Sequence, residues 1–181
     1  KSFDPATKKF NHYYYEEGNP NGISDYTAIS IFADSRGNIW VGTASIAFNK
    51  FNKTTGKFTH YRNNPLDTAS ISANIVQSVF EDSKGNLWIG TNGGGLCQYN
   101  YNSNDFVTHT RNKDLPWSNV YSIVEDNTGN LWLGTEKGLS CYLVAKKEFI
   151  NYDVKDGLQS NLFAASEWLR GSGCKGRDGT L

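Results

Sequence analysis

A ten-residue pattern occurs three times in this chain of 181 residues, and it constrains the fold more than any other feature. The copies are Asp34–Thr43, Asp82–Thr91 and Asp126–Thr135, and each reads Asp-x-x-Gly-Asn-(Ile/Leu)-Trp-x-Gly-Thr. Their first residues lie 48 and 44 positions apart. Repeats of roughly 40–50 residues are typical of propeller blades built from four strands. The sequence therefore predicts an all-β chain of repeated four-stranded antiparallel blades.

Each part of the pattern suits a hairpin between two strands of a blade. Asp at the first position can cap its own turn, and Gly at the fourth can adopt the positive φ that a bulged hairpin loop needs. The β-branched and aromatic residues that follow favour a pleated strand. Because the tryptophans have the same spacing as the repeats, we expect them to pack between blades. The predicted structural set is Trp40, Trp88, Trp132, Asp34, Asp82, Asp126, Gly37, Gly85 and Gly129.

A second repeated element predicts the outer strand of each blade. Phe58 with Tyr61, Phe106 with His109 and Phe149 with Tyr152 follow the three copies, and Phe10 with Tyr13 precedes the first. The chain is therefore out of phase with its repeats, with partial blades at both ends. The first repeat lacks the Gly-Leu pair of the other two, so its third strand is not marked by this motif. The predicted division is a partial blade 1–22, blades 23–62, 71–110 and 117–152, and a partial blade 158–181.

Composition excludes several classes of function. The 18 basic and 18 acidic residues give zero net charge and are scattered, so we expect no nucleic-acid partner. No apolar run approaches the length of a membrane span, so direct membrane contact is not expected from this segment. The histidines and the three cysteines lack metal-ligand spacing, so neither metal nor cofactor is predicted, and the disulfide state stays open. Methionine is absent even at position 1, which predicts an excised or processed segment.

The pattern Val-x-Ser-Ile-x-Glu-Asp-x-x-Gly-x-Leu-Trp-Ile-Gly-Thr, followed by Gly-Leu and Phe-x-x-Tyr, resembles the two-component regulator propeller repeat. The resemblance covers nearly all of residues 1–165. It implies a periplasmic or otherwise extracytoplasmic sensor region of a sensor histidine kinase or hybrid two-component regulator. It also implies a carbohydrate or related ligand, and no catalysis in this chain. The chain carries no phosphoacceptor histidine segment or nucleotide site.

The expected ligand site lies in the loops of one blade face. The loops that join an outer strand to the next inner strand, and those between second and third strands, meet on the same face. Trp117 beside Pro116 offers a ring face for stacking a sugar, with polar groups near it; its alternative role is to cover a blade edge. The predicted ligand set is Trp117, Arg111, Asn119, Arg62, Asn92, Glu136 and Lys137.

Two other functions and two assemblies remain open at this stage. One alternative is a polysaccharide lyase or glycosidase on a propeller scaffold, and the other is a protein-protein interaction or dimerisation module. The repeat count allows a four-bladed ring closed by the two partial blades, or an arc of a larger ring. In the second case self-association of two chains is expected, because an open arc exposes blade faces that normally pack on neighbours. Ligand identity, blade number and oligomeric state are not determined by the sequence.

Overall fold

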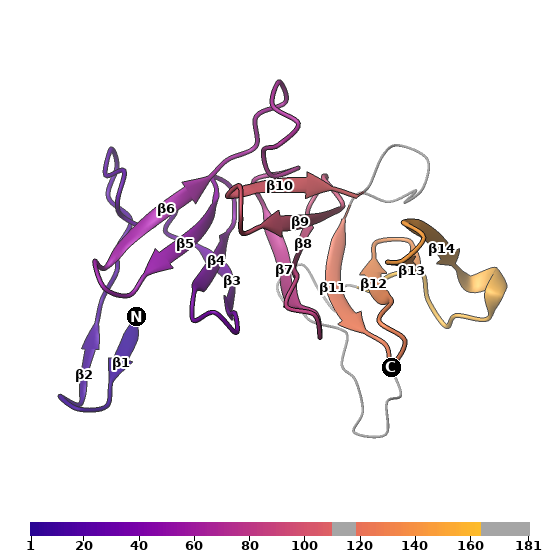
Figure 1. Ribbon diagram of the computed structural model, residues 1–181, viewed down its shortest axis with the longest axis horizontal. Coiled ribbons are helices and arrows are strands. Elements are labelled where there is room, and N and C mark those ends of the chain that lie inside the picture. The colour runs from indigo at the N-terminus through magenta and orange to yellow at the C-terminus, as the bar shows by residue number, and fades with distance from the viewer. Residues whose placement is uncertain (110–118, 164–181) are drawn as a thin grey trace.

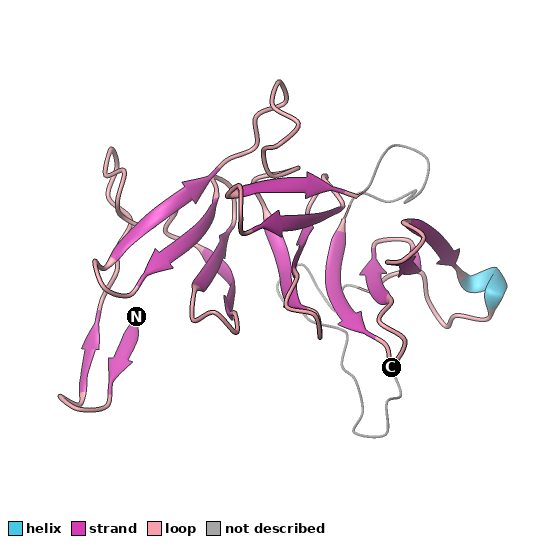
Figure 2. Cartoon of the chain, viewed as in Figure 1, coloured by secondary structure: helices cyan, strands magenta, loops and turns pink. Residues whose placement is uncertain are grey.

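The computed structural model describes residues 1–109 and 119–163 of the chain. In this part the secondary structure is almost entirely β (Figure 2), and the one helical turn is the 3-10 helix η1, Val154–Asp156. Three sheets have four strands each and one has two. The strands of the two-stranded sheet are β1 (Ser2–Asp4) and β2 (Lys9–Asn11). Among the described residues, no helix is long and apolar enough to cross a membrane.

Each four-stranded sheet is formed by one repeat, and its antiparallel strands are in chain order. The first blade contains β3 (Ala28–Ala33), β4 (Ile39–Thr43), β5 (Phe48–Asn52) and β6 (Lys57–Tyr61). The second contains β7 (Val76–Glu81), β8 (Leu87–Thr91), β9 (Leu96–Asn100) and β10 (Asp105–Thr108). The third contains β11 (Val120–Glu125), β12 (Leu131–Thr135), β13 (Gly138–Leu143) and β14 (Glu148–Tyr152). The prediction of four antiparallel strands per repeat is confirmed, including the unmarked third strand of the first repeat.

The blades lie side by side as a fan (Figure 1), in which the first strands of successive blades are neighbours. β3 contacts β7, and β7 contacts β11, whereas the fourth strands lie at the outer edges of the sheets. Each first strand has a register shift near its start, as between Val76 and Ser78. The repeated Asp-x-x-Gly hairpins follow, and their glycines Gly37, Gly85 and Gly129 have φ values of 81°, 76° and 82°. This left-handed conformation is the one that a glycine adopts without steric penalty.

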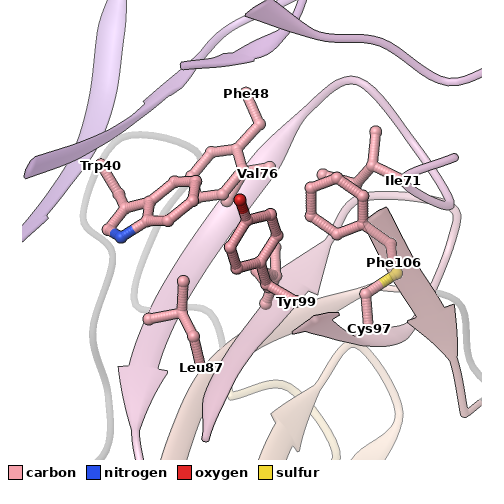
Figure 3. Close-up of a cluster of buried hydrophobic side chains, with 9 residues drawn as sticks. Trp40, Phe48, Ile71, Val76, Leu87, Cys97, Tyr99 and Phe106 are labelled. Atoms are coloured by element: carbon pink, nitrogen blue, oxygen red, sulfur yellow. The ribbon is translucent and has the colours of Figure 1, made fainter. Parts of the chain in front are cut away.

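Aromatic side chains fill the junction between the first and second blades (Figure 3). Trp40 and Phe48 of the first blade are fully buried and belong to one cluster with Leu87, Tyr99 and Phe106 of the second. The ring centroids of Trp40 and Tyr99 lie 4.7 Å apart in an edge-to-face arrangement. Ring pairs in this geometry contribute about 0.5–1.5 kcal/mol beyond the area they bury. The main core of the chain is therefore between sheets.

The second junction repeats this arrangement with other side chains. Trp88 and Leu96 of the second blade join Val120, Leu133 and Tyr142 of the third in one buried cluster. The ring centroids of Trp88 and Tyr142 are 5.8 Å apart. Because the second blade supplies one wall of both clusters, its folding depends on its two neighbours, as in other repeat proteins.

The hairpin of β1 and β2 corresponds to the third and fourth strands of another repeat. Phe3 pairs with Phe10 as Tyr99 pairs with Phe106. In both hairpins a non-glycine residue precedes the fourth strand at positive φ, Lys8 at 55° and Asn104 at 59°. The element that the sequence showed as Phe10 with Tyr13 is therefore an outer strand. The predicted partial blade 158–181 lies largely outside the described residues.

Candidate ligand-binding face

The aspartate of each repeat connects its turn to the tryptophan of the returning strand. Asp34 Oδ2 accepts a hydrogen bond from Trp40 Nε1 at 2.8 Å, and Oδ1 accepts the backbone N–H of Asn38 at 2.7 Å. The same pairs occur at Asp82 with Trp88 and at Asp126 with Trp132, at indole distances of 2.8 and 3.0 Å. Both the hairpin and the indole plane are thus fixed by one carboxylate.

The environment of these aspartates favours their ionised form. Burial opposes ionisation of Asp34, but hydrogen bonds from Trp40, Asn38 and Tyr101 outweigh it and lower the pKa of the carboxyl. The pKa of Asp82 and that of Asp126 are lowered by the same balance, with donors from their own turns. A carboxylate that accepts several N–H groups is held as the anion in this way. These side chains have a structural role, and those of Asp34 and Asp82 are buried.

Neighbouring blades are also linked by a repeated polar contact. Glu81 of the second blade accepts hydrogen bonds from the backbone N–H and the hydroxyl of Ser35 in the first blade, both at 2.7 Å. Glu125 of the third blade does the same with Ser83, at 2.8 and 2.7 Å. These two glutamates therefore serve as polar contacts between adjacent blades.

The loops that connect one blade to the next lie on the opposite face from these turns, and we call that face the loop face. The loops between second and third strands belong to it as well, because antiparallel strands bring both sets to the same ends. Backbone hydrogen bonds join the two sets: Ala44 N–H donates to Thr27 O at 3.0 Å, and Asn92 N–H to Ile75 O at 2.9 Å. The loop face is therefore built on backbone that the blades hold in place.

Several residues of the predicted ligand set meet at the junction of the second and third blades. Asn119 Oδ1 accepts the backbone N–H of Gly93 at 2.8 Å, and Asn119 N–H donates to Glu136 Oε2 at 3.0 Å. Asn92, beside Gly93, is exposed. Lys137 follows Glu136, is exposed, and donates its backbone N–H to Thr135 Oγ1 at 3.2 Å. We call Gly93, Asn119 and Glu136 the Asn119 cluster; its hydrogen bonds between side chains and main chain join three loops.

The remaining predicted residues are elsewhere. Trp117 and Arg111 lie outside the described residues. Arg62 follows β6 of the first blade, on the loop face but not in the Asn119 cluster. It lines a hollow of about 390 Å³ together with Tyr15, Glu16, Asn19, Pro20, Ile46 and His60.

This first-blade hollow combines an aromatic wall with polar groups. Tyr15 is partly buried and Arg62 is exposed at the rim. His60 Nε2 hydrogen bonds to the carbonyl of Gly22 at 2.6 Å, and Asn19 Nδ2 donates to Glu16 Oε2 at 2.9 Å. These hydrogen bonds fix the positions of the polar side chains that line the hollow. In the described part of the chain the only ion pair is Arg36 with Glu81, so no carboxylate there engages the guanidinium of Arg62. Sequence reasoning missed the hollow, since Tyr15 and Asn19 belong to no repeated motif.

Metal-ligand clusters are absent from the residues that the structure describes. His60 and His109 occupy outer-strand ends of different blades, and each is engaged by a local partner. Cys97 and Cys141 are free and buried, and burial raises the pKa of each thiol. The described part of the chain thus offers neither a metal centre nor an activated thiolate.

Comparison with known families explains the repeats. Residues 22–45, 70–93 and 114–137 match the two component regulator propeller family. This chain is built from two-component regulator propeller repeats. Each matched segment includes the first two strands of a blade, which carry the Asp–Trp pair, and the first two segments also carry the inter-blade serines Ser35 and Ser83. No protein of curated function matches the chain significantly.

Solved structures with the same fold include extracellular domains of bacterial signalling proteins. One is from a protein described as a hybrid two component system of B. thetaiotaomicron, with 26% identity, a TM-score of 0.65 and coverage of 82% of this chain and 20% of that one. A second, of the same description and organism, has 24% identity, a TM-score of 0.68 and coverage of 87% and 20%. Virginiamycin B lyase from Staphylococcus aureus shares the fold at 16% identity, with a TM-score of 0.57 and coverage of 78% and 45%. The repeat chain spans about a fifth of the length of the first two.

Proposed function

We propose that this chain is part of the sensor region of an extracytoplasmic two-component regulator and binds a carbohydrate without catalysing a reaction. Three repeats of the two-component regulator propeller support the first part of the proposal. The similar structure at 26% identity is an extracellular domain of a protein described as a hybrid two component system, which supports the location. The parent protein would then convert binding at this propeller into a signal in its other domains.

The observation that carries the ligand proposal is the first-blade hollow with Arg62, which no carboxylate of the described residues engages. Small-molecule sites are concave and mostly apolar, with a few polar groups that fix orientation. A sugar ring presents apolar C–H groups on its faces and hydroxyl groups around its edge. The ring of Tyr15 and the side chain of Ile46 suit the faces, and Arg62 can donate several hydrogen bonds to hydroxyl or carboxylate oxygens. The hollow therefore suits a mono- or disaccharide unit, including an acidic one.

Isothermal titration calorimetry with a panel of neutral and acidic oligosaccharides tests this site. For the sugar that binds, Arg62→Ala should weaken affinity about 10- to 100-fold, because a hydrogen bond from a charged group contributes about 1.5–3 kcal/mol. The matched control is Lys53→Ala, which removes one positive charge from the exposed β5–β6 turn at the other end of the same hairpin. An equal effect of both substitutions, or none for Arg62→Ala, would reject this hollow as the site.

The same panel distinguishes the competing functions. Binding of no oligosaccharide would favour a protein-interaction module. Release of shortened or unsaturated sugar products would favour an enzyme, since lyase activity occurs on this fold in the Staphylococcus aureus protein. If Asn119→Ala weakened sugar affinity and Arg62→Ala left it unchanged, the binding site would instead be at the Asn119 cluster.

A further inference from the structure

One face of the first blade is apolar, and no other blade covers it within the described residues. We call it the first-face surface; its members are Ile23, Ile31, Ile39, Val41, Phe51 and Phe58. Ile31 is 75% exposed, and a hollow of about 330 Å³ lies over this surface. The corresponding residue of the third blade, Ile123, is only 7% exposed. The first-face surface thus has the composition of a buried junction without its second wall.

The two complete junctions show which side chains belong in this hollow. Each places the tryptophan of the preceding blade against the aromatic residue of the third strand, as Trp40 does with Tyr99 and Trp88 with Tyr142. Strand register places Phe51 at the position of Tyr99, since Phe51 pairs with Phe58 as Tyr99 does with Phe106. None of the described tryptophans contacts Phe51. The hollow therefore lies where each of the other two junctions holds a tryptophan side chain.

The outer part of the missing wall is already present. Tyr13, which follows β2, lies edge-on to Phe51 and Phe58 with ring centroids at 4.8 and 5.8 Å. Tyr61 makes the equivalent contacts at the next junction, with Tyr99 at 5.7 Å and Phe106 at 5.3 Å. The β1–β2 hairpin thus supplies the third and fourth strands of a covering blade. What is lacking is its inner pair of strands.

We propose that the first-face surface binds the inner hairpin of a fourth repeat, a two-stranded segment that carries a tryptophan and adds to the free edge of β1. This hairpin would complete a four-stranded blade with β1 and β2 and place its indole against Phe51. A backbone acceptor is also available. In the first junction, Ser30 Oγ of the first blade donates to the carbonyl oxygen of Val76 in the second blade at 3.1 Å. Ala28 has the same register position as Val76, so its carbonyl oxygen can accept the serine of the added hairpin.

Sequence differences indicate which contacts hold this junction. Ala33 stands where Glu81 and Glu125 stand in the other blades, so the serine–glutamate link cannot form here. The apolar and aromatic contacts must therefore provide the binding energy. A whole third blade from a second copy of the chain fits less well, because its own outer strands would overlap the position that Tyr13 and the β1–β2 hairpin occupy.

The test extends the chain at its N-terminus with a second copy of residues 74–96, joined directly to Lys1. Strand register determines this junction point. Phe3 is equivalent to Tyr99, so Lys1 is equivalent to Cys97, and a copy that ends at residue 96 continues directly into Lys1. The added Trp88 should bury itself against Phe51 and raise the melting temperature by at least about 4 °C, the shift expected when a chain of this size gains one or two favourable core contacts. Circular dichroism records melting, and acrylamide quenching records burial of the added indole.

Two variants make the result specific. Trp88→Ala in the added copy alone should abolish most of the gain. Ile31→Asp should shift the melting temperature by less than about 2 °C in the original chain, where Ile31 is exposed, and should remove the gain in the extended chain. An unchanged or non-cooperative melt of the extended chain would overturn the proposal. So would a dimer of the original chain, seen by analytical ultracentrifugation, that Ile31→Asp dissociates, because a second copy would then cover this surface.

Discussion

Replacing Asp82 with asparagine tests whether one carboxylate holds both the turn and the inter-blade indole. Asp82 Oδ2 accepts Trp88 Nε1 and Asn86 Nδ2, each at 2.8 Å, and Oδ1 accepts the backbone N–H groups of Asn86 and Lys84 at 2.9 and 3.0 Å. Asparagine has the same shape but offers one oxygen and one NH2 group. Whichever way the amide is placed, two donors face another donor.

The expected cost follows from this geometry. A buried donor that loses its acceptor costs about 1–3 kcal/mol, and bonds to a charged acceptor are stronger than neutral ones. Because Trp88 is 1% exposed, water cannot replace the carboxylate at the indole. We expect Asp82→Asn to lower the free energy of unfolding by about 2–4 kcal/mol at pH 7. The difference should shrink in acid, because Asp82 stabilises the fold above its ordinary pKa of 3.8 and loses this contribution as pH falls through its lowered folded pKa.

Urea unfolding followed by circular dichroism measures this change. The control Asp67→Asn alters an exposed aspartate in the segment between the first two blades and should stay within about 0.5 kcal/mol. In a Trp88→Phe background, where the indole donor is gone, Asp82→Asn should cost at least about 1 kcal/mol less than in the native chain. Additive effects of the two substitutions, or a cost of Asp82→Asn below about 0.5 kcal/mol, would refute the reasoning.

Two further predictions concern the junction of the second and third blades. A Cβ atom at Gly90 would lie 2.7 Å from the carbonyl oxygen of Val120, so Gly90→Ala should lower the free energy of unfolding by about 1–3 kcal/mol in urea titrations, whereas Gly22→Ala, which meets only the Asn19 side chain, should change it little. His109 accepts the Tyr142 hydroxyl at Nδ1 (2.7 Å) and hydrogen bonds to Gln98 Oε1 through Nε2 (3.1 Å), and burial, with a smaller effect of Lys147, lowers its pKa to about 4. Because the unfolded chain protonates this histidine near pH 6.5, about 2 kcal/mol of stability should be lost between pH 6.5 and 4, and His109→Gln should remove this part of the pH profile; an unchanged profile would contradict the assignment.

The repeated parts of the fold follow from local sequence rules. Alternation of apolar residues and the Asp-x-x-Gly turn define the first hairpin of each blade, and the spacing of Phe10 from Tyr13 identifies an outer strand before the first full repeat. The indole partner of Asp34 does not follow from these rules. Capping of its own turn is predictable, but the bond to Trp40 depends on how the returning strand passes over that turn.

Residues outside the repeats were the least predictable. Ile71 is an isolated apolar residue in a polar connection, yet it is fully buried between the first two blades. Asn119 and Gly93 are 26 positions apart and meet only because two blades are adjacent. Tyr15 lines the first-blade hollow because the segment after β2 lies beside the first blade, and not because of a repeated motif. No periodic signal exists for such contacts, because they arise from the arrangement of whole sheets.

The order in which each junction is assembled gives the array a direction. In both described junctions an indole from one repeat faces a ring on the third strand of the next, so the two sides of a blade are unlike and cannot substitute for each other. Duplication or loss of one complete repeat therefore keeps the indole–ring contact of each remaining junction, provided that the repeat is added or removed as a whole. Blade number can thus change between relatives by whole units, while each new member inherits an interface that already fits.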